Sequence, residues 1–120
     1  MDKKVIKKIT DLKVWGKAHE LTLSIYKITK NFPEQEKYGL ISQMRRCSVS
    51  VPSNIAEGFK RRGRDKFNFY YYAEASLEEL KYQILLSYDL KYLFKDDYHK
   101  LRDLANKTGR MLNGWIQALK

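Results

Sequence analysis

The residues best suited to bind a ligand are positively charged and lie in two clusters. The first cluster consists of Lys3, Lys4, Lys7 and Lys8. The second cluster consists of Lys60, Arg61, Arg62, Arg64 and Lys66. Ammonium and guanidinium groups form strong, charge-assisted hydrogen bonds with phosphate oxygens. The two clusters therefore predict a binding surface for a polyanion, with RNA or DNA as the expected ligand.

The charge of the whole chain agrees with this expectation. The 120 residues include 24 Lys and Arg against 14 Asp and Glu, a formal net charge of +10. A positive net charge affects solubility and the choice of partners rather than the fold. It favours negatively charged partners, which include nucleic acid, an acidic protein surface and anionic lipid. No apolar run approaches the roughly 20 residues that a membrane-spanning helix needs. The single cysteine, Cys47, suits a reducing cytoplasm, which is the expected location.

Side chains for catalysis or metal binding do not form a familiar pattern. His19 and His99 are far apart in the sequence, and neither has a carboxylate or a cysteine at a known ligand spacing. A glycine-rich phosphate loop is also missing from the sequence. We therefore predict a protein that is not an enzyme and that uses no cofactor and no metal.

Four segments carry apolar residues at alternating spacings of three and four, which predicts four amphipathic helices. Short connections between long helices favour antiparallel neighbours. The predicted fold is all-α, an up-down-up-down four-helix bundle. We expect a basic tail at residues 1–10 and the bundle domain at 11–120, with helices near 11–31, 36–59, 65–89 and 96–119.

Several polar residues and one proline predict local features of these helices. Asp11, Asp65 and either Asp96 or Asp97 are expected N-caps of the first, third and fourth helices. Pro52 lies inside the apolar pattern of the second helix, so that helix is expected to be continuous but kinked. Among the alternatives for Arg45 and Arg46, we favour ion pairs with Glu78 or Glu79 over phosphate binding or solvation.

The predicted topology separates the charges in space. The start of the first helix, the connection between the second and third, and the end of the fourth should share one end of the bundle, which brings both basic clusters together. The other end should be mildly acidic, since it carries Glu34, Glu36, Asp96 and Asp97.

Some apolar residues fall outside the four stripes, and they predict an oligomer because soluble monomers rarely expose so much apolar surface. They include Trp15, Leu40, Phe69, Tyr71, Tyr92 and Ile116. The aromatic run at residues 67–72 is interpreted as core and subunit contacts, with base stacking as the alternative.

Beyond these patterns, the order of several short motifs is similar to a known family. The motifs are residues 11–15 (Asp-Leu-Lys-Val-Trp), 38–40 (Tyr-Gly-Leu), 43–46 (Gln-Met-Arg-Arg), 50–52 (Ser-Val-Pro), 54–58 (Asn-Ile-Ala-Glu-Gly) and 76–80 (Ser-Leu-Glu-Glu-Leu). The chain resembles the four-helix-bundle proteins encoded in bacterial 23S rRNA intervening sequences. The related accessory variability determinant of diversity-generating retroelements belongs to the same superfamily.

The resemblance implies a four-helix protomer that assembles into a homopentameric, basic, ring-like barrel. It also implies association with structured RNA, with a ribosomal partner, or with a reverse transcriptase and its RNA. The main hypothesis is therefore an oligomeric nucleic-acid-binding protein. The alternative is a protein-interaction scaffold that docks a partner enzyme such as a reverse transcriptase.

Overall fold

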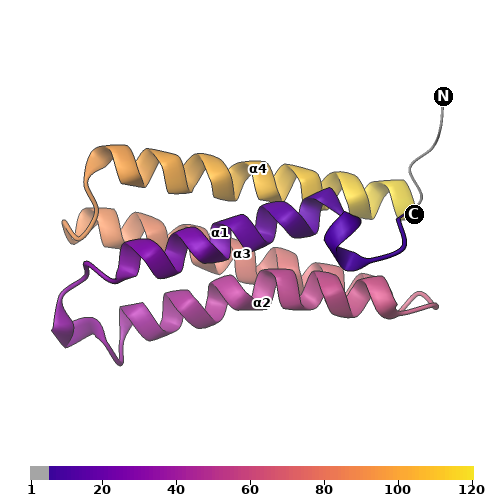
Figure 1. The fold of residues 1–120 in the computed structure, drawn as a ribbon, viewed down its shortest axis with the longest axis horizontal. Coiled ribbons are helices and arrows are strands. Elements are labelled where there is room, and N and C mark those ends of the chain that lie inside the picture. The colour runs from indigo at the N-terminus through magenta and orange to yellow at the C-terminus, as the bar shows by residue number, and fades with distance from the viewer. Residues whose placement is uncertain (1–5) are drawn as a thin grey trace.

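A computed structural model describes residues 6–120 of the chain, and Figure 1 shows its four long helices. These residues contain no β-strand, so the predicted all-α class is confirmed. Two short 3-10 turns, η1 and η2, precede α1 and α2. The elements are η1 (Ile9–Asp11), α1 (Lys13–Thr29), η2 (Glu34–Glu36), α2 (Leu40–Lys60), α3 (Lys66–Asp89) and α4 (Lys95–Leu119).

The four helices lie side by side around one core. Helix α1 packs against α2 and α4, and α3 packs against the same two helices. Figure 1 shows the start of α1, the α2–α3 connection and the end of α4 at one end of the molecule, which we call the basic end. The α1–α2 and α3–α4 connections lie at the other end, which we call the distal end.

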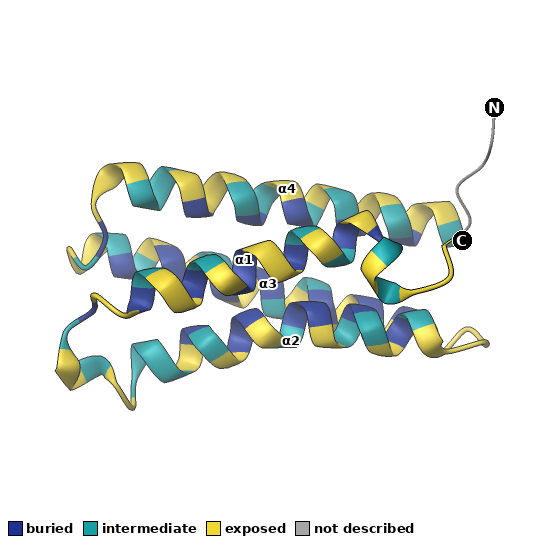
Figure 2. Ribbon diagram, in the orientation of Figure 1, coloured by how far each residue is buried: buried dark blue, intermediate teal, exposed yellow. Residues whose placement is uncertain are grey.

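The predicted apolar stripes supply the core. Their residues turn toward the centre of the bundle, while the outer face of each helix is exposed (Figure 2). Fully burying one such aliphatic or aromatic side chain contributes about 1.5–3 kcal/mol. The largest of the fully buried apolar side chains are Leu21, Ile25, Met44, Ile55, Tyr70, Leu80, Ile84, Leu112 and Ile116.

Helix α2 continues through Pro52, as predicted, and residues 54–58 beyond it are helical. Proline has no N–H, so the carbonyl of Ser48 loses its usual donor within the helix. The hydroxyl oxygen of Thr22 on α1 lies 2.8 Å from the Ser48 carbonyl oxygen and 3.1 Å from that of Ala18. The Thr22 hydroxyl therefore donates to the nearer oxygen, and α1 supplies the hydrogen bond that α2 lacks.

The expected cap of the first helix is wrong. Helix α1 begins at Lys13, and Leu12 occupies its N-cap position without a side-chain hydrogen bond. The carboxylate of Asp11 instead accepts the backbone N–H of Lys8 at 3.2 Å, which closes the η1 turn. The apolar side chain of Leu12 is buried, so core packing rather than capping fixes the start of α1.

The two other expected caps also differ from the structure. Asp65 does precede α3, but its backbone is already helical and its side chain makes no cap hydrogen bond. Phe94 occupies the N-cap position of α4, which places Asp96 and Asp97 in the first turn. Carboxylates in a first turn stabilise a helix through its dipole, without the directed bond of a cap.

The apolar residues expected outside the stripes are only partly available for contacts with another chain. Ile116 is buried in the core, because the buried stripe of α4 runs through Thr108, Leu112 and Ile116, while Trp115 is only half-buried. Of the others, Tyr71 is exposed, and Trp15, Leu40, Phe69 and Tyr92 are half-buried. Further exposed apolar side chains are Leu23, Tyr26, Val49, Tyr72, Tyr82, Leu85 and Phe94.

Candidate nucleic-acid interface

The predicted basic cluster lies on the short connection between α2 and α3. Lys60 ends α2 and Lys66 begins α3, and the residues between them are exposed. Just before this connection, α2 approaches α3 so closely that a Cβ atom on Gly58 would lie 2.6 Å from the ring of Tyr70. Because Tyr70 is fully buried, this contact fixes the point at which the basic connection leaves the bundle.

The cations of this connection differ in their surroundings. Within residues 6–120, Lys60 and Arg62 form no ion pair. Arg61 lies 3.5 Å from a carboxylate oxygen of Glu57 and 3.5 Å from one of Asp65. Exposed pairs of this kind contribute about 0–1 kcal/mol. A phosphate group can therefore replace either carboxylate at little cost.

Other cations of the basic end lie over aromatic rings at the start of α3. The guanidinium carbon of Arg61 is 4.5 Å from the ring centre of Phe69, and that of Arg64 is 5.3 Å from the ring centre of Phe67. The Lys66 ammonium is 5.7 Å from the same Phe67 ring. Such contacts hold long side chains in place while their charged groups stay in water.

The predicted site residues are brought together only in part. Lys3 and Lys4 lie outside the described residues. Lys7 and Lys8 are exposed ahead of η1, at the same end as the basic connection (Figure 1). The sequence analysis missed Lys120, whose ammonium lies 5.6 Å from the ring centre of Tyr71. Lys120 could have been identified from its position at the end of the fourth predicted helix, because that helix was expected to end beside both basic clusters.

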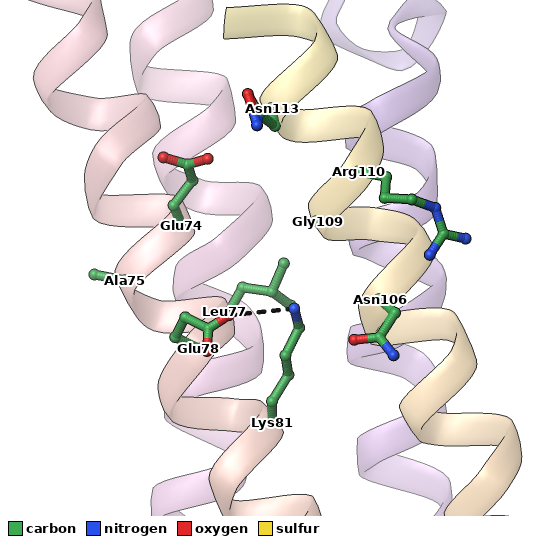
Figure 3. A pocket seen from close by; sticks show the side chains of 9 residues that line it. All are labelled: Glu74, Ala75, Leu77, Glu78, Lys81, Asn106, Gly109, Arg110 and Asn113. Carbon is green, nitrogen blue, oxygen red and sulfur yellow. Dashed lines mark hydrogen bonds and ion pairs between the residues drawn. The ribbon is translucent and has the colours of Figure 1, made fainter.

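A second candidate region is the groove of about 520 Å³ between α3 and α4 (Figure 3). Glu74 and Glu78 line its α3 side, and Glu78 pairs with Lys81 at 3.3 Å. Gly109 lies on the α4 side, while Arg110 points away from the two carboxylates. The lining contains two carboxylates and two cations, Lys81 and Arg110, so the groove has no net positive charge to attract a polyanion.

The Cys47 side chain lies in a polar pocket between α2 and α3. Its sulfur is 3.0 Å from the Ser76 carbonyl oxygen and 3.3 Å from a Glu79 carboxylate oxygen. Burial, followed by the hydrogen bond and the negative charge of Glu79, raises the pKa of Cys47 to about 12. The thiol therefore stays protonated at neutral pH and is a poor nucleophile. Across residues 6–120, no three His, Cys, Asp or Glu side chains are placed to hold a metal ion.

A family model described as 23S rRNA-intervening sequence protein matches residues 10–114. The chain belongs to this family. The resemblance drawn from the sequence motifs is thereby confirmed. No curated protein matches the chain.

This member of the 23S rRNA-intervening sequence protein family is also similar to a solved structure. That structure is a protein of unknown function from the S23 ribosomal protein family of Bacteroides thetaiotaomicron. The two chains are 24% identical, with a TM-score of 0.76, over 86% of this chain and 97% of the other. At this identity the similarity concerns the fold. No helix among residues 6–120 is long and apolar enough to span a membrane.

Proposed function

We propose that this family member is a non-enzymatic, basic, oligomeric bundle protein of the cytoplasm that binds nucleic acid, with structured RNA as the main ligand. The proposal rests on exposed cations from three parts of the chain at one end of the bundle (Figure 1). They are Lys7 and Lys8 before η1, Lys60, Arg61, Arg62 and Arg64 around the α2–α3 connection, and Lys120 after α4.

Binding would occur mainly through phosphate groups. Lys60 and Arg62 have no ion pair within residues 6–120, and Arg61 has only weak exposed ones. Each phosphate that a cation neutralises releases condensed counterions, which drives binding and makes it sensitive to salt. Phosphate contacts carry no base identity, so the affinity should depend little on sequence.

An oligomer would strengthen this surface. Exposed apolar side chains on α1 and α2, namely Leu23, Tyr26 and Val49, need cover, as does Leu85 on α3. A ring of five protomers would bring five basic ends together around one axis. Light scattering should then give five times the 14.3 kDa of one chain. A mass near 14.3 kDa at micromolar concentration would refute the oligomer.

Filter binding at several salt concentrations tests the function. We expect both RNA and DNA to bind at low salt, with RNA bound more tightly. If about four to eight phosphates are neutralised, log affinity should fall with log salt with a slope of about −3 to −7. If neither polymer binds at low salt, the nucleic-acid proposal is wrong.

The alternative is a protein-interaction scaffold that docks a partner enzyme such as a reverse transcriptase, or a ribosomal partner. The α3–α4 groove supports it, because Glu74 forms no ion pair within residues 6–120 and suits a basic protein segment better than a phosphate (Figure 3). Recovery of the protein from its native cells, with identification of bound protein and sequencing of bound nucleic acid, separates the two functions.

A further inference from the structure

The first two turns of α3 carry a group of aromatic side chains that phosphate binding alone does not explain. This group, which we call the platform, consists of Phe67, Phe69, Tyr71 and Tyr72. Phe67 is buried and Phe69 is half-buried, whereas Tyr71 and Tyr72 are 41% and 58% exposed. The platform therefore has a fixed base and two outward-facing rings.

Contacts between the rings hold the exposed tyrosines in position. The rings of Phe69 and Tyr72 meet edge to face with their centres 6.0 Å apart. The rings of Phe67 and Tyr71 are tilted with their centres 6.5 Å apart. Aromatic pairs in these arrangements are stabilising. The two tyrosine rings are thus ordered before any ligand arrives, which lowers the entropy lost on binding.

Cations lie on both sides of the platform. Arg61 lies 4.5 Å from the ring centre of Phe69, the ring that contacts Tyr72. Lys120 lies 5.6 Å from the Tyr71 ring centre. Lys60, which has no ion pair within residues 6–120, is one residue from Arg61. An exposed aromatic ring close to a positive charge is complementary to a nucleotide, which has a flat base and a negative phosphate.

We propose that the platform stacks unpaired bases, so that the basic end binds single-stranded or looped segments of nucleic acid in preference to duplex. This inference rests on the proposed function and adds the class of nucleic acid. Bases within a duplex already stack on one another, so they cannot reach rings on the convex surface of a helix. Stacking accepts every base and needs no sequence motif.

The same helix offers a matched control. Tyr82 is 61% exposed, yet no cation is found over its ring in the part of the chain that the structure describes. We compare wild type with the double variant Tyr71→Leu/Tyr72→Leu and with Tyr82→Leu. Leucine keeps helix propensity and apolar bulk, and it changes no charge.

The probes are a 20-nucleotide single-stranded RNA, the same RNA with one 2-aminopurine, and a 20-base-pair duplex RNA. We expect the double variant to lose roughly 5- to 100-fold in single-strand affinity, as base–aromatic stacking predicts. Duplex affinity and the salt dependence should change little, because the charges are unchanged. Wild type, but not the double variant, should quench 2-aminopurine fluorescence, and Tyr82→Leu should behave as wild type.

The outcomes separate this inference from the proposed function. Equal binding of single strand and duplex by wild type, or an unchanged single-strand affinity in the double variant, overturns the stacking platform and leaves phosphate binding intact. If neither the single-stranded RNA nor the duplex RNA binds at low salt, the proposed function is overturned as well. If the double variant is unstable by circular dichroism, Tyr72→Leu alone repeats the test at the more exposed position.

Discussion

The two ends of the bundle use aromatic residues in different ways. At the distal end, the Tyr92 hydroxyl donates to a carboxylate oxygen of Glu36 at 2.8 Å, and the Tyr92 ring packs 5.4 Å from that of Phe32. The hydrogen bond to Glu36 and, to a lesser extent, burial raise the pKa of Tyr92. At the basic end, Arg61 and Lys120 lie over aromatic rings, a type of contact that the distal end also has between Lys37 and Tyr38 at 5.6 Å.

The comparison shows that aromatic residues can either link two connections of the chain, as at the distal end, or hold cations at the surface, as at the basic end. The Tyr92–Glu36 bond links the α3–α4 connection to the α1–α2 connection, so the polar groups of both residues are used within the chain. Arg61 forms only exposed ion pairs, with Glu57 and Asp65 at 3.5 Å, and Lys120 forms none within residues 6–120, so both cations stay available to a ligand. The basic end therefore offers cations from three parts of the chain to a ligand, whereas the exposed lysines of the distal end lie among Glu34, Glu36, Asp96 and Asp97.

Removing charge from the basic end gives the largest predicted effect on binding. The basic-end variant carries Lys60→Gln, Arg61→Gln, Arg62→Gln and Arg64→Gln. We expect its RNA affinity at low salt to fall about 100-fold or more, and its salt slope to flatten by about 3, because up to four phosphate contacts are lost. The fold should remain, because exposed charges contribute little to stability. Filter binding and thermal melting measure the two quantities.

The matched control removes the same charge from the distal end. It carries Lys30→Gln, Lys37→Gln, Lys91→Gln and Lys95→Gln, all at exposed positions. We expect only a few-fold loss of affinity, because these charges lie far from the proposed phosphate contacts and are screened by salt. Equal losses in the two variants would show that net charge, and not the basic end, determines binding.

A glycine substitution separates the geometry of the basic end from its charge. Gly58→Ala would place a Cβ atom 2.6 Å from the buried Tyr70 ring, and we expect it to lower the free energy of unfolding by about 1–3 kcal/mol. Gly16 in α1 has no atom within 4 Å of a Cβ, so Gly16→Ala should be stabilising by about 0.5–1 kcal/mol. Urea denaturation measures both, and a neutral Gly58→Ala would mean that α2 and α3 separate easily here.

Another prediction concerns the middle of the bundle, away from both ends, and it does not involve binding. Since the pKa of Cys47 is raised from 9.0 to about 12, iodoacetamide should react with the folded protein at pH 8 roughly 1000-fold more slowly than with the unfolded chain. Glu79→Gln should lower this pKa and speed the reaction, because it removes a negative charge. Rapid labelling of the native protein, followed by mass spectrometry, would contradict the assigned environment.

The same shift predicts a pH dependence of stability. The folded state holds the proton of Cys47 more tightly than the unfolded state, so the stabilisation is fully present below pH 9. It is lost as the pH rises from 9 toward 12, because the unfolded chain ionises first. A Cys47→Ser variant, which cannot ionise in this range, should lose less stability over the same interval.

Periodicity predicted the four helices well because the core requires apolar residues every three or four positions. The sequence placed the start of the second helix near residue 36, but α2 begins at Leu40, since η2 and Gly39 intervene. The expected cap at Asp11 failed because the backbone of Leu12, not of Asp11, precedes the first helical turn. Cap positions depend on one or two backbone angles that periodicity does not report.

Contacts between helices were less predictable than the helices themselves. Arg45 was expected to pair with Glu78 or Glu79, but it donates to the Thr29 hydroxyl at 3.0 Å and stacks on Tyr26. The direction of the Arg45 side chain depends on how α2 is rotated about its axis relative to α1, and the spacing of apolar residues does not determine this rotation closely enough. The basic cluster at residues 60–66 was recognisable because it is contiguous, whereas Lys120 joins it only through the fold.

The hydrogen bond from Thr22 to the Ser48 carbonyl has a consequence for how the chain folds. An isolated α2 must leave this carbonyl to water, because Pro52 cannot donate to it. In the folded protein Ser48 is buried, so the carbonyl can lose its water only when α1 arrives with Thr22 opposite it. Sliding α1 by one turn, about 5.4 Å, would leave a buried acceptor unpaired at a cost of about 1–3 kcal/mol. The proline thus sets the register of the α1–α2 hairpin, and it couples the completion of α2 to the docking of its neighbour.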